Sequence, residues 1–272
     1  MPDANFYRAF EDRHRGTRDL IKSRVRAYLP FVTPLLTLYG EGAVLDMGCG
    51  RGEWLELMGE EGFTAHGVDL DAAMLAACQE LGLSVEQGDA LEALKRLPDA
   101  SQCVVSGFHI AEHVPFAVLQ EMVAEALRVL KPAGLLILET PNAENLVVGA
   151  SSFYLDPTHQ RPLPPLLLSF LTEYAGFSRT KILRLQESSE LAAHSARVTL
   201  LQVLAGVSPD YAVVAQKTAS AEELAHFSAP FEQEYGLTLA ALAARYETDL
   251  RAEILRELKP PRKKAASAAP KK

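Results

Sequence analysis

The sequence is poor in cysteine and has no long apolar run. These two absences argue against a disulfide-rich protein and against a membrane-spanning one. The three cysteines among 272 residues, Cys49, Cys78 and Cys103, have the spacing of neither a metal site nor a disulfide framework, so we expect reduced thiols in the core. No apolar run is long enough to span a membrane. The first residues, MPDANFYRAFEDRHR, are too charged for a signal peptide, and we expect a cytoplasmic protein.

The sequence also has few basic residues for its acidic content. It has 27 lysines and arginines and 35 acidic residues, which gives a net charge of −8. This balance argues against a general nucleic-acid-binding surface, and we expect no nucleic-acid partner. With 48% hydrophobic and 23% charged residues, the composition is that of an ordinary soluble protein. The length suffices for one α/β domain with additions.

Strand-like and helix-like segments alternate through residues 43–141, which predicts parallel βαβ units in a doubly wound α/β sheet with helices on both faces. The expected strands are residues 43–46, 64–69, 83–86, 102–106 and 134–140. The expected helices between them are residues 52–61, 71–81, 90–96 and 116–130. Two further strand candidates follow at residues 181–185 and 210–217.

A glycine-rich turn follows the first of these strands. The stretch AVLDMGCGRGE, residues 43–53, places Asp46 at the end of an apolar run and then Gly48, Gly50 and Gly52 at alternate positions. Such glycines let a ligand approach the bare backbone at the start of the next helix. Asp69 ends the second strand, 19 residues after Gly50, where an acid is the usual partner of ribose hydroxyls.

VLDMGCGRGE, then GVDLD, then GDA at residues 88–90 resembles the class I S-adenosylmethionine-dependent methyltransferases. The resemblance implies a Rossmann-like sheet of seven strands, the seventh antiparallel and inserted between the fifth and sixth. It also implies S-adenosylmethionine as cofactor, with the methionine part near the glycines, the ribose at Asp69 and the adenine at Asp89. The residues that we expect to contact it are Asp46, Gly48, Gly50, Asp69, Leu70, Asp89, Ala90 and Phe108.

A histidine-rich run, His109 to His113, follows the fourth strand. If a helix begins there, His109, Glu112 and His113 share one face. The ubiquinone-pathway O-methyltransferases have a similar run, with a glutamate in place of His109, and in them these positions are associated with a divalent metal. A metal set of these three residues is one interpretation. The interpretation that we favour is a hydrogen-bonded helix start without metal.

The irregular stretch at residues 141–165 follows the fifth strand, so we expect it to overhang the same crevice. His159 is our first choice as the base that deprotonates an acceptor hydroxyl, with Asp156 orienting it and His109 as second choice. The residues expected to contact the acceptor are Tyr154, Arg161 and His113.

The segments at the two ends complete the predicted organisation. The N-terminal segment is basic and amphipathic, and it is either a helical cover for the sheet edge or a lid that brings Arg18 to the cofactor carboxylate. The C-terminal extension has a stripe that docks on the domain or self-associates. The expected divisions are a cap at 1–40, the cofactor domain at 41–218, a helical extension at 219–258 and a disordered basic tail at 259–272.

The outer segments bear on the acceptor. FYRAFEDRHRGTRD and NLVVGASSFYLDPTHQRPLPP resemble methyltransferases of bacterial surface-polysaccharide (O-antigen) synthesis. That resemblance implies a saccharide or lipid-linked glycan acceptor, methylated on a sugar hydroxyl or a sugar phosphate. One alternative is a quinone-precursor or small-molecule O-methyltransferase with a divalent metal. Another is a non-catalytic assembly partner with a methyltransferase-like fold.

Overall fold

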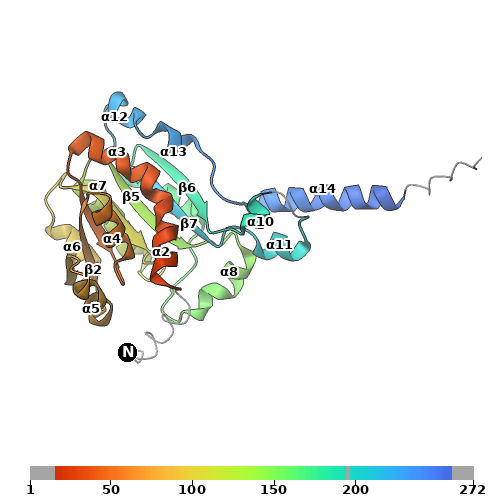
Figure 1. Cartoon of the computed structure of the whole chain (residues 1–272), viewed down its shortest axis with the longest axis horizontal. Helices are drawn as coiled ribbons and strands as arrows, with labels where there is room; N and C mark the ends of the chain where they lie inside the picture. The colour runs from red at the N-terminus through yellow and green to blue at the C-terminus, as the bar shows by residue number, and fades with distance from the viewer. Residues whose placement is uncertain (1–15, 194–196, 259–272) are drawn as a thin grey trace, which may run out of the picture.

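A seven-stranded sheet forms the centre of the computed structural model, which describes residues 16–193 and 197–258 (Figure 1). The strand order is β3-β2-β1-β4-β5-β7-β6, and β7 runs antiparallel between β5 and β6. This confirms the predicted fold class. The strands are β1 (Ala43–Met47), β2 (Thr64–Asp69), β3 (Val85–Gln87), β4 (Gln102–Phe108), β5 (Leu130–Pro141), β6 (Arg179–Leu185) and β7 (Asp210–Gln216).

Two apolar layers cover the sheet because neighbouring strand residues point to opposite faces. Leu45 and Val105 pack with α6, α7 and α9 on one face, while Val44 and Val104 pack with α2, α3 and α4 on the other. The helices of these layers are α2 (Arg18–Val25), α3 (Leu29–Tyr39), α4 (Glu53–Glu60), α6 (Ala90–Arg96), α7 (Phe116–Val129) and α9 (Pro165–Ala175). The cysteines are buried and free, as expected.

The register of the central strands brings their carboxyl ends together. Met47 at the end of β1 lies opposite Gly107 in β4, and Gly107 lies opposite Leu138 in β5. The chain leaves β1 toward β2 on one side and reaches β4 on the other. A ligand crevice is expected at this switch point.

The N-terminal segment forms α2 and α3, joined by the short helix η1 (Arg26–Tyr28). Tyr28 is fully buried against the sheet, so this part of the expected cap is packed on the domain. The lid hypothesis concerns mainly residues 1–15, which lie outside the described part of the chain.

The C-terminal extension is not one continuous stripe. It forms α12 (Ala221–Ala225), α13 (Ser228–Glu232) and α14 (Leu239–Glu257). Phe227 is fully buried in the layer that contains α3, so the start of the extension packs on the sheet domain. α14 then extends away from the body of the molecule (Figure 1). The expected basic tail lies outside the described residues, and the expected division into domains stays a prediction.

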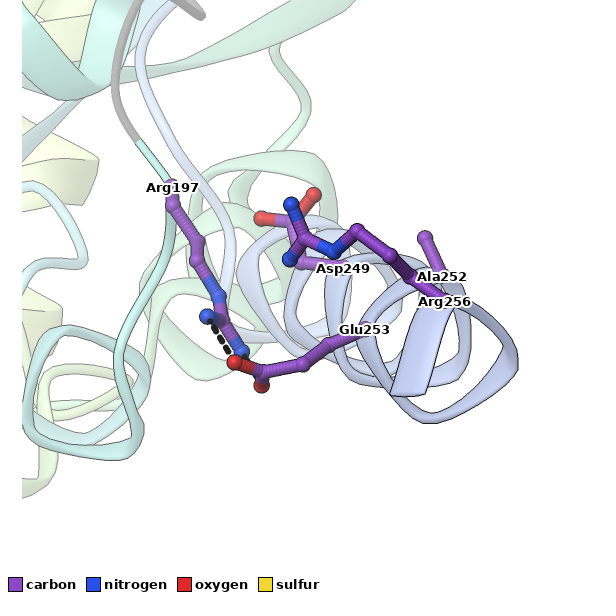
Figure 2. A pocket seen from close by; sticks show the side chains of 5 residues that line it. All are labelled: Arg197, Asp249, Ala252, Glu253 and Arg256. Carbon is purple, nitrogen blue, oxygen red and sulfur yellow. Dashed lines mark hydrogen bonds and ion pairs between the residues drawn. The ribbon is translucent and has the colours of Figure 1, made fainter. Parts of the chain in front are cut away.

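The apolar contacts of α14 come from its first half. Leu242 is fully buried in a small cluster with α10 (Ser189–Ala192) and α11 (Leu200–Ala205), whereas Leu258 is 74% exposed. A surface pocket beside α14 contains an ion pair in which Arg197 reaches Glu253 (Figure 2). Its lining residues are Arg197, Asp249, Ala252, Glu253 and Arg256. None of the described helices is long and apolar enough to cross a membrane.

Candidate functional site

The glycine-rich turn lies at the carboxyl end of β1. Gly48 has a φ of +67° and Gly52 one of +77°, values that side chains with a Cβ rarely adopt. A Cβ on Gly52 would lie 2.7 Å from Leu83 and 2.9 Å from the Cys78 sulfur, so the turn also leaves no room for one. The sequence therefore needs glycine here both for conformation and for close packing.

The two expected cofactor acids follow at the ends of β2 and β3. Asp69 Oδ2 accepts a hydrogen bond from Gly50 N at 2.8 Å, and its Oδ1 accepts one from Asp71 N at 2.8 Å. Asp89 is exposed and caps α6 by accepting from Glu92 N at 3.0 Å. The Leu70 side chain beside them is 71% exposed, and Ala90 is the first residue of α6.

The other residues expected near the cofactor lie deeper. Asp46 is 2% exposed and accepts a hydrogen bond from Ser106 Oγ at 2.7 Å. Phe108 packs beside Trp54, with ring centroids 5.3 Å apart. Arg18 lies beside the glycine-rich turn, where it donates to the carbonyl of Arg51 at 2.5 Å. Its guanidinium is also paired with Glu56.

The expected helix over His109–His113 is wrong. β4 ends at Phe108, α7 begins at Phe116, and the residues between them form turns. His109 has a φ of +56°, a left-handed conformation that is costly for a residue with a Cβ and is found often at functional sites. The turn directs its ring toward Glu112 (Nδ1–Oε1 3.2 Å) and Glu139 (Nε2–Oε1 3.6 Å).

His109 is thereby held between two carboxylates. Burial lowers the pKa of His109, but hydrogen bonds with Glu112 and Glu139 outweigh burial and raise this pKa well above its usual value. Burial raises the pKa of Glu112, but the hydrogen bond with His109 outweighs it, so the pKa of Glu112 is lowered. Burial raises the pKa of Asp210, at the start of β7, to about 6.

The loop after β5 folds back onto the His109–His113 turns, as expected from its position. It contains α8 (Leu146–Ala150) and η2 (Ser152–Leu155). The His113 and His159 rings meet edge to face, with centroids 4.6 Å apart. Thr158 Oγ lies 2.9 Å from His113 Nδ1 and donates to Asp156 Oδ1 at 2.6 Å. Burial lowers the pKa of His113.

His159 has one ring nitrogen fixed and one facing acids. Its Nδ1 lies 2.6 Å from the Phe153 carbonyl oxygen, which can only accept, so Nδ1 carries a proton. In the neutral ring the lone pair is then on Nε2, which lies 3.8 Å from Asp156 Oδ2 and 3.9 Å from Glu112 Oε1. The Phe153 carbonyl thus orients the ring through Nδ1, while Asp156, the expected orienting acid, lies on the side of Nε2.

The expected substrate residues at the loop surface are accessible. Tyr154 is 60% exposed, and the Arg161 guanidinium lies 4.5 Å from the Phe116 ring centroid in a cation–π contact.

The expected metal set is divided between two clusters. Glu112, His113 and His159 bring one potential ligand atom each within 4.8 Å of one another. His109 instead groups with Glu139 and Asp210. No local motif pointed to Glu139 and Asp210, because they come from β5 and β7 and reach His109 only through the sheet order.

Comparisons with known proteins agree with this architecture. A family model described as a methyltransferase domain matches residues 44–134. The chain is 36% identical to an S-adenosylmethionine-dependent methyltransferase of known structure from Archaeoglobus fulgidus, with a TM-score of 0.68 over 78% of this chain and 100% of that one. The chain belongs to the class I S-adenosylmethionine-dependent methyltransferases. S-adenosylmethionine is therefore its cofactor.

Curated relatives of this methyltransferase match over shorter lengths. A probable S-adenosylmethionine-dependent methyltransferase from Mycolicibacterium smegmatis is 33% identical, over 57% of this chain and 59% of that protein. A ubiquinone biosynthesis O-methyltransferase from Pseudomonas fluorescens is 36% identical, over 36% of this chain and 44% of that protein. The methyltransferase thus spans about half the length of these relatives.

Proposed function

We propose that the chain methylates an oxygen atom of a saccharide or lipid-linked glycan, on a sugar hydroxyl or sugar phosphate in bacterial surface-polysaccharide synthesis. The cofactor supplies an electrophilic methyl group on a sulfonium. What the protein must supply is alignment of the acceptor oxygen and, for a hydroxyl, a group that removes its proton.

For the cofactor, the proposal places the methionine part over Gly48 and Gly50, the ribose at Asp69 and the adenine between Leu70 and Asp89. The placement is supported by the positive φ of the glycines and by the exposed apolar side chain of Leu70, directly after Asp69. The Asp69 carboxylate accepts from Gly50 N and Asp71 N and has further lone pairs that could accept from the ribose hydroxyls.

For the acceptor, the single observation that carries the proposal is the arrangement at His159. Its Nδ1–H is committed to the Phe153 carbonyl, so Nε2 is the basic nitrogen and faces Asp156 and Glu112. Both acids therefore lie beside the nitrogen that would take the proton. A base is required for a hydroxyl and not for a phosphate, so this geometry favours the hydroxyl. The raised pKa of His109 favours its cationic form, which is suited to hold an anionic oxygen.

The test is transfer of labelled methyl from S-adenosylmethionine to matched acceptors: a sugar, the same sugar phosphorylated, and a catechol. Mass spectrometry of the product identifies the modified oxygen. We expect a methyl ether on the sugar acceptors. Labelled catechol without labelled sugar would contradict the saccharide proposal.

The cluster of Glu112, His113 and His159 favours a second candidate, a small-molecule or quinone-precursor O-methyltransferase that uses a divalent metal. Two imidazoles and a carboxylate are a common donor set for such ions. The ubiquinone O-methyltransferase relative is compatible with it. Under this candidate, a chelator abolishes turnover and added divalent ions restore it. Under the first proposal, turnover is insensitive to both.

A further inference from the structure

Three large apolar side chains at the outer end of α14 are open to solvent. Ile254 is 47% exposed, Leu255 is 63% exposed, and Leu258, directly after the helix, is 74% exposed. We call these three residues the outer apolar face. At this end α14 extends away from the body of the molecule (Figure 1). Removing such side chains from water is favourable, so their grouping indicates a surface that covers them.

The outer apolar face points away from the rest of the protein. The surface pocket lies on the other side of the helix, where Glu253 pairs with Arg197 (Figure 2). With 3.6 residues per turn, the outer apolar face lies about half a turn around the helix from the residues that line this pocket. Within the described part of the chain, this side of α14 is therefore left uncovered.

A strongly basic segment follows this face directly in the sequence. Residues 259–272, KPPRKKAASAAPKK, contain six basic residues and no acidic one. Because the whole chain has a net charge of −8, the residues before this segment have a net charge of −14. Positive charge is thus concentrated next to the outer apolar face of an otherwise acidic protein.

The outer part of α14 separates this positive charge from the acidic body. Tyr246 is the last residue of α14 that packs in the small apolar cluster with α10 and α11. From Tyr246 to Leu258 the helix spans about 18 Å at 1.5 Å per residue, more than twice the Debye length of about 8 Å at physiological salt. The charge of the body is therefore largely screened at the end of α14, where an anionic surface would be attracted.

We propose that the outer apolar face and the basic segment bind the surface of an anionic lipid bilayer. The apolar side chains enter the boundary between head groups and acyl chains, and the basic side chains pair with lipid phosphates. Nucleic acid would pair with the basic side chains but would leave the apolar face in water. The lipid-linked acceptor proposed above would bring the chain to a bilayer as well, but this inference rests on α14 and the basic segment alone.

Sedimentation of the full chain with lipid vesicles tests the proposal. The vesicles contain phosphatidylcholine alone or a mixture with phosphatidylglycerol. Wild type should bind the mixed vesicles and not the neutral ones, and high salt should weaken the binding. A basic side chain near an anionic surface contributes about 1 kcal/mol, equivalent to about fivefold in the partition coefficient. Replacing Arg262, Lys263 and Lys264 together with glutamine should thus lower this coefficient about 100-fold.

A second variant tests the apolar part of the surface. Leu255→Gln removes an apolar side chain without changing the charge, and it should lower the partition coefficient about tenfold. Leu81→Gln is the matched control, because Leu81 is a 53% exposed leucine at the end of α5 (Ala72–Glu80). This control should bind the vesicles as wild type does.

Each other occupant of the outer apolar face predicts a different result. Failure of wild type to bind mixed vesicles would overturn the proposal. So would binding to vesicles and to a DNA duplex that depends on the basic residues but is the same in Leu255→Gln. A dimer in lipid-free analytical ultracentrifugation that Leu255→Gln dissociates would assign the face to a second copy of the chain. Methyl transfer to a water-soluble sugar should be unchanged in all these variants, so each of these results leaves the proposed function standing.

Discussion

Oε1 of the buried Glu112 lies 3.2 Å from Nδ1 of His109. The same oxygen lies 3.9 Å from His159 Nε2, and the second carboxylate oxygen accepts from Thr140 at 2.9 Å. Glu112 therefore connects the turn after β4, the end of β5 and the loop that follows β5. One carboxylate positions both histidines that are candidates for proton transfer or anion binding.

Replacing Glu112 with glutamine should lower the pKa of His109 toward its usual value of 6.5, because a charged acceptor is lost. A histidine with a raised pKa stabilises the fold fully at a pH below its pKa in the unfolded state. It loses that effect as the pH rises through its pKa in the folded state. Glu112 has a lowered pKa, so it stabilises the fold fully above pH 4.5 and loses that effect as the pH falls through its folded pKa. The difference in free energy of unfolding between wild type and Glu112→Gln should thus be greatest between about pH 4.5 and pH 6.5.

Proton NMR titration of the His109 ring measures the first effect, and denaturant unfolding across pH measures the second. Glu125→Gln is the matched control, since Glu125 pairs with Arg128 on the surface of α7. An unchanged His109 titration in a folded Glu112→Gln protein would show that Glu139 alone holds the proton.

Asp69→Ala should weaken cofactor binding by about 10- to 150-fold, because the ribose hydroxyls lose a charged acceptor. Asp71→Ala is the control. Asp71 caps α5 (Ala72–Glu80) by accepting from Ala73 N at 2.8 Å, so its loss should cost about 1 kcal/mol of stability without changing affinity. Calorimetric titration of both variants separates the two roles. Equal affinity of Asp69→Ala and wild type would remove Asp69 from the site.

The two ends of α14 should differ in their effect on stability, as Leu242 in its first turn and Leu258 directly after its last residue can show. Leu242→Ala removes a fully buried side chain and should cost about 2–5 kcal/mol. Leu258→Ala changes the same residue type at a 74% exposed position and should stay within about 0.5 kcal/mol. Denaturant unfolding measures both. A large loss in Leu258→Ala would indicate that the exposed half of α14 is covered in solution, for instance by a second copy of the chain.

Local patterns predicted the sheet well because each strand of the cofactor domain is an apolar run that ends in a turn signal. Asp69 ends β2 as predicted, and the predicted ends of the first and fourth strands lie one and two residues before the observed ends, Met47 and Phe108. The false helix over His109–His113 shows the limit of spacing arguments. Pro115 follows directly and disfavours helical backbone at Val114, so a helix could begin only after it.

The rest of the site could not be predicted because it depends on contacts between distant segments. Glu139 reaches His109 from β5, and Asp210 reaches it from β7, which lies next to β5 only through the inserted strand order. Thr158, whose hydroxyl joins His113 to Asp156, had no role in any motif. Three-dimensional contacts, more than residue types, determine which acids surround each histidine.

His159→Ala should reduce kcat by about 10²- to 10⁴-fold on a hydroxyl acceptor, the usual cost of losing a general base, with cofactor affinity unchanged. His226→Ala is the matched control, because His226 is an exposed residue at the end of α12. Steady-state turnover with calorimetry of the cofactor gives both quantities. Full turnover by His159→Ala on the true acceptor would show that His159 is not the base.

Arg161→Ala distinguishes the two acceptor chemistries. The Arg161 guanidinium is exposed and stacks on Phe116, a contact worth about 0.5–1 kcal/mol at such positions. On a hydroxyl acceptor, kcat/KM should therefore fall by no more than about fivefold, because proton removal by His159 is retained. On a phosphate acceptor, the loss of a charge-assisted contact should cost about 10- to 150-fold, while His159→Ala should be mild, because a phosphate oxygen needs no base. The geometry at His159 leads us to expect the first pattern, measured with the matched sugar and sugar phosphate. Near wild-type turnover of both variants on the true acceptor would show that the loop after β5 is not the catalytic loop.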